Sequence, residues 1–405
     1  FLFHLIASQR YARYRPHMQA TLESAAEIAV RPRDPRLFDI YDKVMQQERL
    51  DAADCLALFE SQDLLAIGAM ADWVNRRKNG NRVFFVANQH LNPTNVCILR
   101  ATCTFCSFAR TPKEDGAYTM SLEEAFHEAD LIKETPIREF HIVGGLHPKL
   151  RLEYYEDLIR GLKERYPGVE VKALTAVEIA HLARIEKTSV EEVLTRLRAA
   201  GLDSMPGGGA EVFSKGVRAT LAKRKLAAEE WLDVHRRAHR MKIPTNCTML
   251  YGHIETYQDR VDHLSALRDL QDETGGFLTY IPLAYHPDNN ELGEELGRTG
   301  TATTGFDDLK NLAIGRLFLD NFQHIKTHWI MNTAKVSQVA LHFGVDDLEG
   351  TVVRERIYHE AGAHTPEGMT FNEIIRLIRD AGKRPVERDA LYNEIRDWGG
   401  EERVA

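Results

Sequence analysis

Three of the five cysteines of this chain, Cys97, Cys103 and Cys106, lie within ten residues of one another. Thiols clustered this closely are typical of a metal site or a redox pair. A [4Fe–4S] cluster normally uses four thiolates, so a cluster held by three would keep one iron open for a small molecule. A structural zinc site would instead need a fourth ligand, for which His90 and His141 are candidates. Three unrelated buried thiols are the plain alternative.

Glycine-rich segments form a second group of candidate site residues. Gly144 and Gly145, and the three glycines at 207–209, come directly after segments that we expect to be strands. Glycine permits a positive φ and a close approach of the backbone to a ligand, and a tight turn without a ligand is the alternative. Three glycines followed by Ala210 and Glu211 favour the ligand. Neither segment matches the glycine pattern of a nucleotide-phosphate loop.

Histidine and glutamate side chains also follow several of the expected strands. A single histidine in such a loop is more often structural than catalytic. Three histidines that follow strands at the same end of a sheet favour proton transfer or binding of an acidic substrate. Glutamates in these loops could hold ribose hydroxyls or an amino group, and each also suits a helix cap. The histidines are His147, His253 and His286, and the glutamates are Glu178, Glu211 and Glu255.

The remaining cysteines and two further histidines are expected to be mainly structural. Cys55 falls in a helical segment, and we predict that it is a small buried hydrophobic side chain. Cys247 lies inside an expected strand and is a weaker candidate for a fourth metal ligand. His235 and His239 are four residues apart but lack the H-E-x-x-H arrangement, so we predict that they face solvent on a helix.

The elements that must position these residues are indicated by the hydrophobic periodicity. Residues 34–78 show a helical pattern, with Asp51 placed to cap one helix and Gly80 placed to end another. Beyond them, short apolar runs alternate with helix-length segments. The expected strands are 83–95, 139–143, 169–174, 202–205, 245–250, 277–283, 324–330 and 338–343. This alternation predicts a (β/α)8 barrel of the TIM type, and a doubly wound open sheet is the competing fold.

Length and composition describe an ordinary globular protein. The chain has 405 residues, of which 43% are hydrophobic and 28% are charged, and its net charge is −8. This charge argues against a broad nucleic-acid-binding surface, and no stretch reaches the roughly 20 apolar residues of a membrane span. Five cysteines, three of them clustered, favour a reducing cytoplasm over a disulfide framework.

The same patterns suggest four regions along the chain. The chain begins with Phe1, and Met18 suits a natural start, so we expect residues 1–17 to be an upstream extension or a segment added in cloning. Residues 18–82 would form an N-terminal helical layer, residues 83–365 the barrel, and residues 366–405 a C-terminal helical segment.

The motifs and the expected barrel together resemble the radical S-adenosylmethionine (SAM) superfamily. The phrases HLNPTNVC, FHIVGGLHP, KALTAVEI, LDSMPGGGAEVF, TMLYGHIET and KRPVERDALY are similar to its menaquinone-futalosine and deazaflavin branch, and most of all to the aminofutalosine synthases. The resemblance covers about residues 35–395. The superfamily usually spaces its cysteines C-x3-C-x2-C, whereas this chain has C-x5-C-x2-C, with two extra residues near Ala101 and Thr102. A loop can absorb such an insertion at little cost.

The resemblance implies a [4Fe–4S] cluster held by Cys97, Cys103 and Cys106, with S-adenosyl-L-methionine as co-substrate on the fourth iron. It also implies an electron donor such as flavodoxin or ferredoxin as a partner. The cofactor-binding residues that it implies are Phe105, Gly144, Gly145, Glu211, Gly252 and Glu255.

The same resemblance implies a reaction of menaquinone biosynthesis. Enzymes of this family add the adenosyl radical to 3-[(1-carboxyvinyl)oxy]benzoate and yield 6-amino-6-deoxyfutalosine, methionine and CO2, which is a C–C bond-forming transfer. The two carboxylates of this substrate require cationic or N–H partners, and the candidates are His147, His253, His286 and Arg388. A dehypoxanthine-futalosine cyclase and a deazaflavin synthase subunit are alternatives within the superfamily, and a non-enzymatic Cys3His zinc protein is one outside it.

Overall fold

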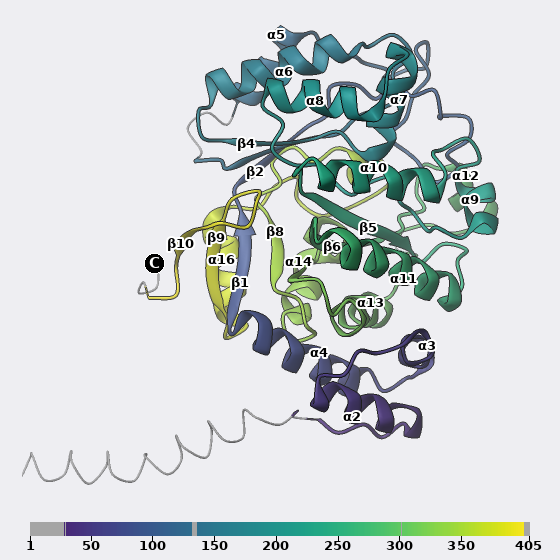
Figure 1. Cartoon of the computed structure of the whole chain (residues 1–405), viewed down its shortest axis with the longest axis vertical. Coiled ribbons are helices and arrows are strands. Elements are labelled where there is room, and N and C mark those ends of the chain that lie inside the picture. Colours follow the sequence, from purple (N-terminus) through teal and green to yellow (C-terminus); the bar gives the residue numbers. More distant parts are fainter. Residues whose placement is uncertain (1–27, 29, 132–135, 301, 401–405) are drawn as a thin grey trace, which may run out of the picture.

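An N-terminal group of helices precedes the sheets. The computed structural model describes residues 28, 30–131, 136–300 and 302–400, so the expected extension at 1–17 lies outside the described residues. Asp51 caps the second α-helix through a capping box with Asp54, and Gly80 follows the third with φ 64°. The helical pattern of residues 34–78 is thereby confirmed. These helices are η1 (Pro35–Leu37), α2 (Phe38–Gln46), α3 (Ala52–Glu60) and α4 (Leu64–Asn79), gathered at one end of the molecule (Figure 1).

The strands of the described residues form three sheets, with strand orders β10-β9-β1-β8, β2-β3-β4 and β5-β6-β7. The paired strands run parallel, except for β9 and β10. Strands β2, β5, β7 and β8 are buried along their whole length, as parallel strands covered on both faces are. Their bounds are β1 (Arg82–Val86), β2 (Asn88–Leu91), β3 (Glu139–Ile142), β4 (Glu170–Ala173), β5 (Thr245–Tyr251), β6 (Phe277–Ala284), β7 (His324–Ile325), β8 (Asp347–Gly350), β9 (Arg384–Arg388) and β10 (Glu394–Asp397).

Single parallel bridges connect the three sheets to one another. They pair Lys172 with Ser204, Met205 with Thr245, Lys326 with Asp347, and Gln89 with Val353. The prediction of an α/β fold with parallel strands is therefore confirmed. The regular ladders of the described residues, however, do not form the one closed eight-stranded sheet that we expected.

Helices follow most of the strands and cover the sheets on the outside (Figure 1). Helix α13 packs against α4 and so joins the N-terminal helices to the rest of the fold. The helices are α5 (Leu122–Asp130), α6 (Leu152–Arg165), α7 (Ala176–Glu186), α8 (Val190–Ala200), α9 (Lys215–Leu221), α10 (Ala228–Arg240), α11 (Tyr257–Thr274), α12 (Glu291–Leu296), α13 (Gly305–Phe318), α14 (Trp329–Ala340), α15 (Ile357–Glu360) and α16 (Phe371–Asp380).

Several expected elements differ from those observed. The prediction of a strand at 338–343 is wrong, because these residues form the end of helix α14 and the turn that follows it. The strand expected at 324–330 is only the two residues of β7, and residues 202–205 contribute bridges without a regular strand. Short apolar runs do not distinguish a buried helix from a strand, which explains these errors.

The C-terminal segment at 366–405 is not wholly helical. Helix α16 is followed by strands β9 and β10, and β9 pairs in parallel with β1 from the other end of the sequence. The C-terminal residues therefore extend the sheet that contains β1 and β8.

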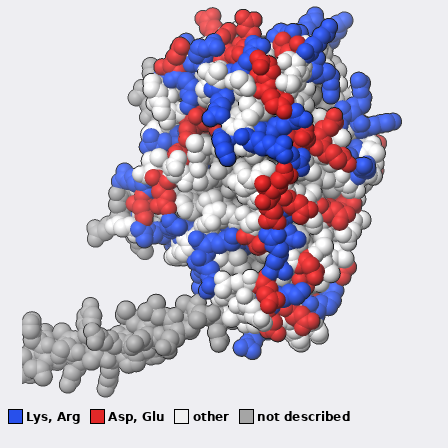
Figure 2. All heavy atoms as spheres, in the orientation of Figure 1, with Lys and Arg blue, Asp and Glu red and all other residues white. Residues whose placement is uncertain are grey.

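The outer surface of the molecule mixes charges of both signs. On the face seen in Figure 2, acidic and basic side chains are interspersed, and no single-sign field covers it. Within the described part of the chain, none of the helices has both the length and the apolar character needed to cross a membrane.

Candidate active site

A cavity of about 280 Å³ collects residues that lie far apart in the sequence. Its lining includes the three clustered cysteines, both glycine segments and side chains from β2, β3, β5 and β6. The site residues predicted from the sequence that line it are Cys97, Cys103, Cys106, Phe105, Gly144, Gly145, Glu178 and Glu211. The cysteine and glycine segments follow the ends of parallel strands, so these residues meet at one mouth, as the sequence predicted.

The cysteine loop is anchored by backbone hydrogen bonds to other parts of the fold. The N–H of Cys97 donates to the carbonyl of Arg110 at 2.9 Å, and Cys103 forms an antiparallel bridge with Ala222. All three thiols are free, and burial raises the pKa of Cys97 and raises that of Cys103 to about 12. Deprotonation of these thiols therefore needs a compensating positive charge, such as a metal centre supplies.

The two extra residues of the cysteine spacing form a turn. The N–H groups of Thr102 and Cys103 both donate to the carbonyl of Leu99, at 2.8 and 2.9 Å. Ala101 is exposed, whereas Leu99 is buried and lines the cavity. The insertion is thus accommodated at the surface, and all three thiols still line one cavity.

The Gly144–Gly145 edge is held against the cysteine loop. A Cβ on Gly145 would lie 2.3 Å from the carbonyl oxygen of Val96, so only glycine fits there. Gly144 donates its N–H to Glu178 at 3.0 Å, and Glu178 also accepts from the N–H and hydroxyl of Thr175. Burial raises the pKa of Glu178 to about 7. Glu178 therefore combines a helix cap with support of the glycine edge.

Glu211 lies in the cavity wall beside a lysine that the sequence analysis missed. The Nζ atom of Lys225 lies 2.6 Å from Glu211 Oε1 and 5.3 Å from the centre of the Phe105 ring. Burial alone would lower the pKa of Lys225, but Glu211 and the neighbouring thiols Cys103 and Cys106 outweigh it and raise this pKa above its usual value. The cavity thus holds a buried ammonium group beside two of the thiols. In the sequence, only the basic run at 223–225 could have drawn attention to Lys225.

The 207–209 glycines line the cavity, and Gly207 packs against β5. A Cβ on Gly207 would lie 2.6 Å from the Cα of Cys247, and Gly209 has φ 88°. Close packing of the backbone therefore explains why residue 207 is glycine, and the positive φ explains why residue 209 is glycine. Gly208 has neither constraint and is the glycine most available to a ligand.

Two of the predicted catalytic histidines form turns instead of lining the cavity. The Nδ1 atom of His147 accepts from the N–H groups of Lys149 and Leu150, at 3.1 and 2.9 Å. The Nδ1 atom of His253 accepts from the N–H of Ile254 at 2.7 Å. These local hydrogen bonds explain the presence of both histidines, so we do not propose His147 or His253 as catalytic.

The other residues of the 252–255 turn are also accounted for locally. Glu255 accepts from the N–H of Gly252 at 2.6 Å and pairs with Arg260 at 2.7 Å. Burial would raise the pKa of Glu255, but His253 and Arg260 outweigh it and lower this pKa to about 2. Neither Gly252 nor Glu255 lines the cavity, so the structure gives the turn no cofactor contact.

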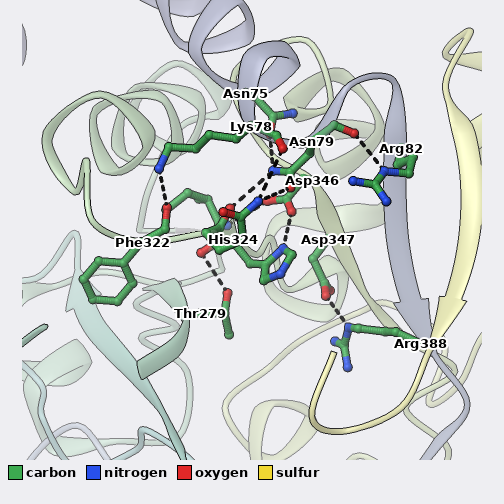
Figure 3. A network of polar contacts seen from close by, with 12 residues as sticks. Asn75, Lys78, Asn79, Arg82, Thr279, Phe322, His324, Asp346, Asp347 and Arg388 are labelled. Carbon is green, nitrogen blue, oxygen red and sulfur yellow. Dashed lines mark hydrogen bonds and ion pairs between the residues drawn. The ribbon is translucent and has the colours of Figure 1, made fainter. Parts of the chain in front are cut away.

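His286 and Arg388 also lie outside the cavity lining. His286 is buried and packs edge-on against Tyr358, whose ring does line the cavity, with 5.9 Å between ring centres. Arg388 is fully buried and donates from Nε to Asp347 at 2.6 Å, in a polar network shown in Figure 3. We therefore do not retain Arg388 as a substrate-binding residue.

The predictions for the remaining cysteines and histidines are confirmed in part. Cys55 is fully buried, as predicted, and Cys247 lies within β5 and does not line the cavity. The prediction that His235 and His239 face solvent is wrong, because both are buried and bond to the hydroxyl of Thr245 at 2.8 Å. His90 and His141, named as possible zinc ligands, line the cavity and stack on each other with ring centres 4.6 Å apart.

Comparison of the chain with known proteins shows the family to which it belongs. The description "Radical SAM superfamily" matches residues 91–267, and "CofH/MqnC C-terminal region" matches residues 274–401. The chain is 50% identical over 366 residues to the aminodeoxyfutalosine synthase of Thermus thermophilus, covering 90% of this chain and 98% of that protein. The chain belongs to the radical SAM superfamily.

Two further comparisons show a more distant relative and a similar fold. The cyclic dehypoxanthine futalosine synthase of Streptomyces coelicolor is 36% identical over 360 residues, covering 88% of each protein. The crystal structure of HydG from Carboxydothermus hydrogenoformans superposes with a TM-score of 0.70 over 93% of this chain and 85% of that one, at 19% identity. At this identity the superposition supports the fold alone.

Radical SAM enzymes use a [4Fe–4S] cluster and S-adenosylmethionine, and the donor set of this cavity fits them. In the part of the chain that the structure describes, no three His, Cys, Asp or Glu side chains are placed to hold one metal ion together. A cubane binds each cysteine to a different iron, so its three thiols need only face one space, and these three do. Family membership and this arrangement both disfavour the Cys3His zinc alternative.

Proposed function

We propose that this chain is an aminofutalosine synthase of menaquinone biosynthesis. The observation that carries the proposal is the 50% identity to the Thermus enzyme over nearly the whole length of both proteins. The lower identity of 36% to the cyclic dehypoxanthine futalosine synthase favours the synthase over the cyclase. The cavity supports the proposal, because it combines three free thiols with a glycine edge and buried polar side chains.

The proposed reaction is a transfer that forms a C–C bond. The 5′ carbon of the adenosyl group is joined to the terminal CH2 carbon of the enol-ether double bond of 3-[(1-carboxyvinyl)oxy]benzoate as its bond to sulfur breaks. The aryl group then migrates from oxygen to carbon, and the vinyl carboxylate leaves as CO2 with release of the one electron that was used to cleave S-adenosylmethionine. The products are 6-amino-6-deoxyfutalosine, methionine and CO2. When bound, the cluster supplies the electron that breaks the C–S bond of S-adenosylmethionine.

The residues of the chain bind and position the reactants in this proposal. Cys97, Cys103 and Cys106 would hold three irons, and the Gly144–Gly145 edge would lie beside the methionine part of S-adenosylmethionine. Lys225 lies beside the thiols, and its ion pair with Glu211 fixes its position and neutralises its charge. Burial of the cavity keeps water from the reacting carbons.

Three broader features belong to the same proposal. The bridged parallel sheets would act together as a (β/α)8-type barrel around the cavity. The electron would come from a carrier such as flavodoxin or ferredoxin. The free cysteines suit a reducing compartment, and we propose the cytoplasm.

The decisive experiment is an anaerobic assay of the full chain. The protein is reconstituted with iron and sulfide, then reduced in the presence of S-adenosylmethionine and 3-[(1-carboxyvinyl)oxy]benzoate, and the products are analysed by mass spectrometry. We expect aminofutalosine and methionine. Cys103→Ala should lose both cluster absorbance and product, whereas Cys247→Ala, which alters a buried thiol outside the cavity, should retain both.

Two results would contradict the proposal. Cleavage of S-adenosylmethionine to free 5′-deoxyadenosine, without aminofutalosine, would indicate hydrogen abstraction and favour the cyclase or the deazaflavin enzyme. A protein that binds zinc but assembles no iron–sulfur cluster would contradict the cluster assignment itself.

A further inference from the structure

Three buried side chains in the lining of the cavity have polar atoms without partners. They are Nε2 of His90, Nδ1 of His328 and Oδ1 of Asn246, and none of these atoms has a hydrogen-bond partner among the described residues. The three residues are 8%, 8% and 2% exposed, and all line the cavity. A buried polar group without a partner costs about 1–3 kcal/mol. Two of these atoms are ring nitrogens on residues that line one cavity, and each can donate to a ligand when protonated, whereas Oδ1 of Asn246 can only accept.

The three residues come from separate elements that converge on the cavity. His90 lies within β2 and Asn246 within β5, whereas Cys97 and Gly144 follow the ends of their strands. Because the strands are parallel, residues within them lie deeper than residues after them. His328 follows β7, and its ring meets that of His90 with 6.5 Å between ring centres. His90 and Asn246 thus lie deeper than the cysteine loop, and His328 packs against His90 from the end of its strand.

Histidine rings dominate this part of the cavity. His90 and His141 are register partners on β2 and β3, and their rings stack at 4.6 Å with 21° between their planes. The ring of His328 meets that of His90 edge-on at 6.5 Å. We call His90, His141 and His328 the inner histidine cluster.

The full charges around the inner histidine cluster are already paired. Lys326 lies 2.9 Å from Glu349, Glu355 lies 2.8 Å from His359, and Lys172 lies 2.6 Å from Glu139, whose other oxygen is 3.5 Å from His141. An anion entering here therefore finds no free ammonium or guanidinium group among these residues.

The imidazoles are the groups that can gain charge. Burial lowers the pKa of His90 to about 3 and lowers that of His328, so both are neutral near pH 7 before a ligand binds. A carboxylate at hydrogen-bond distance favours the protonated imidazole, because the ion pair is stabilised where little water enters.

We propose that the inner histidine cluster binds the aryl carboxylate of the substrate and that one imidazole takes up a proton from solvent as it binds. The proposal rests on the proposed function, in which the vinyl carbon must face the cysteine loop and S-adenosylmethionine. The aryl carboxylate is the polar group at the opposite end of that substrate. It would therefore reach the part of the cavity lined by His90 and His328, whose unpartnered ring nitrogens can donate to it when protonated.

Isothermal titration calorimetry of the reconstituted holoenzyme tests this proposal without turnover. The anaerobic protein, with S-adenosylmethionine but no reductant, is titrated with 3-[(1-carboxyvinyl)oxy]benzoate at pH 7.5 in phosphate and in Tris, which have different ionisation enthalpies. The heat should depend on the buffer and correspond to uptake of roughly one proton. Affinity should fall as pH rises. Binding with no proton uptake in either buffer would overturn the proposal.

Variants and a truncated ligand locate the proton. His90→Gln and His328→Gln should each bind the substrate at least about tenfold more weakly and take up less than half as much proton. His342→Gln replaces an exposed histidine outside the cavity and should match the parent protein. The probe 2-phenoxyacrylate, which lacks the aryl carboxylate, should bind without proton uptake. Unchanged proton uptake in both cluster variants, or uptake with the probe, would contradict the assignment.

The assay of product formation separates this inference from the proposed function. If the parent protein forms aminofutalosine but binds its substrate without proton uptake, the histidine subsite alone is wrong. If the parent protein forms no aminofutalosine, the proposed function is wrong, and the subsite for this carboxylate is wrong with it.

Discussion

At the scale of single residues, the cavity depends on charges that are neutralised in place. Lys225 and Glu211 are 15% and 8% exposed at their side chains, so their opposite charges compensate each other where little water enters. The ammonium group of Lys225 also lies beside Cys103 and Cys106. The ion pair therefore serves both the fold and the environment of the thiols.

We predict that Lys225→Met destabilises the protein by about 3 kcal/mol, because Glu211 is left as a buried carboxylate without its partner. Lys215→Met is the matched control, since Lys215 and Glu229 are 87% and 65% exposed and their pair contributes at most about 0.5 kcal/mol. Urea unfolding of the metal-free protein measures both. Adding Glu211→Gln to Lys225→Met should restore most of the loss, and equal stability of the two lysine variants would contradict the prediction.

At the scale of elements, the site depends on how closely two segments approach. The segment after β3 runs against the cysteine loop after β2, and Gly145 donates its N–H to the carbonyl of Thr94 at 2.8 Å. Glu178 at the start of α7 holds the adjacent Gly144. The cysteine loop is thus positioned by backbone contacts as well as by its own turn.

We predict that Gly145→Ala impairs cluster assembly. The new Cβ would lie 2.3 Å from the carbonyl oxygen of Val96, and the cysteine loop must shift to relieve this clash. Iron and sulfide content after reconstitution should fall by more than half. Gly216→Ala is the control, because a Cβ on Gly216 in α9 meets no atom within 4 Å. Full cluster loading of Gly145→Ala would show that the loop tolerates the shift.

At the scale of the whole molecule, buried ion pairs join strands that are distant in the sequence. Arg388 on β9 pairs with Asp347 on β8, and both side chains are fully buried. In the same network, Asp346 pairs with Arg316 from α13 and with His324 from β7, as Figure 3 shows in part. The first pair connects the C-terminal strand β9 to β8 within one sheet, and the Asp346 pairs connect the start of β8 to α13 and β7.

We predict that Arg388→Met costs about 3–5 kcal/mol, because it leaves the Asp347 carboxylate buried without its partner. Arg384 lies on the same strand but pairs with Asp397 at the surface, where the arginine side chain is 55% exposed. Arg384→Met should therefore cost about 1 kcal/mol or less. The midpoints of urea unfolding compare the two. If the two variants unfold at the same midpoint, the network does not stabilise the fold as proposed.

The sequence alone determined the features that depend on local chemistry. The cysteine cluster, the glycine edge and the N-terminal helices were predicted, because residue type, spacing and short-range periodicity encode them directly. Where a short apolar run was ambiguous, as at 338–343, the prediction failed. Helix α14 there is set by packing against distant elements.

Only the tertiary structure decided which polar side chains enter the cavity. His147 and His253 follow strands as predicted, yet their Nδ1 atoms accept hydrogen bonds from nearby backbone N–H groups. Lys225 and His328, which the sequence analysis did not name, line the cavity, together with His90, which it named only as a possible zinc ligand. The direction of a side chain, and the partner that neutralises it, depend on contacts between segments far apart in the chain. Local pattern carries no information about those contacts, so the sequence located the thiols and the fold located the groups around them.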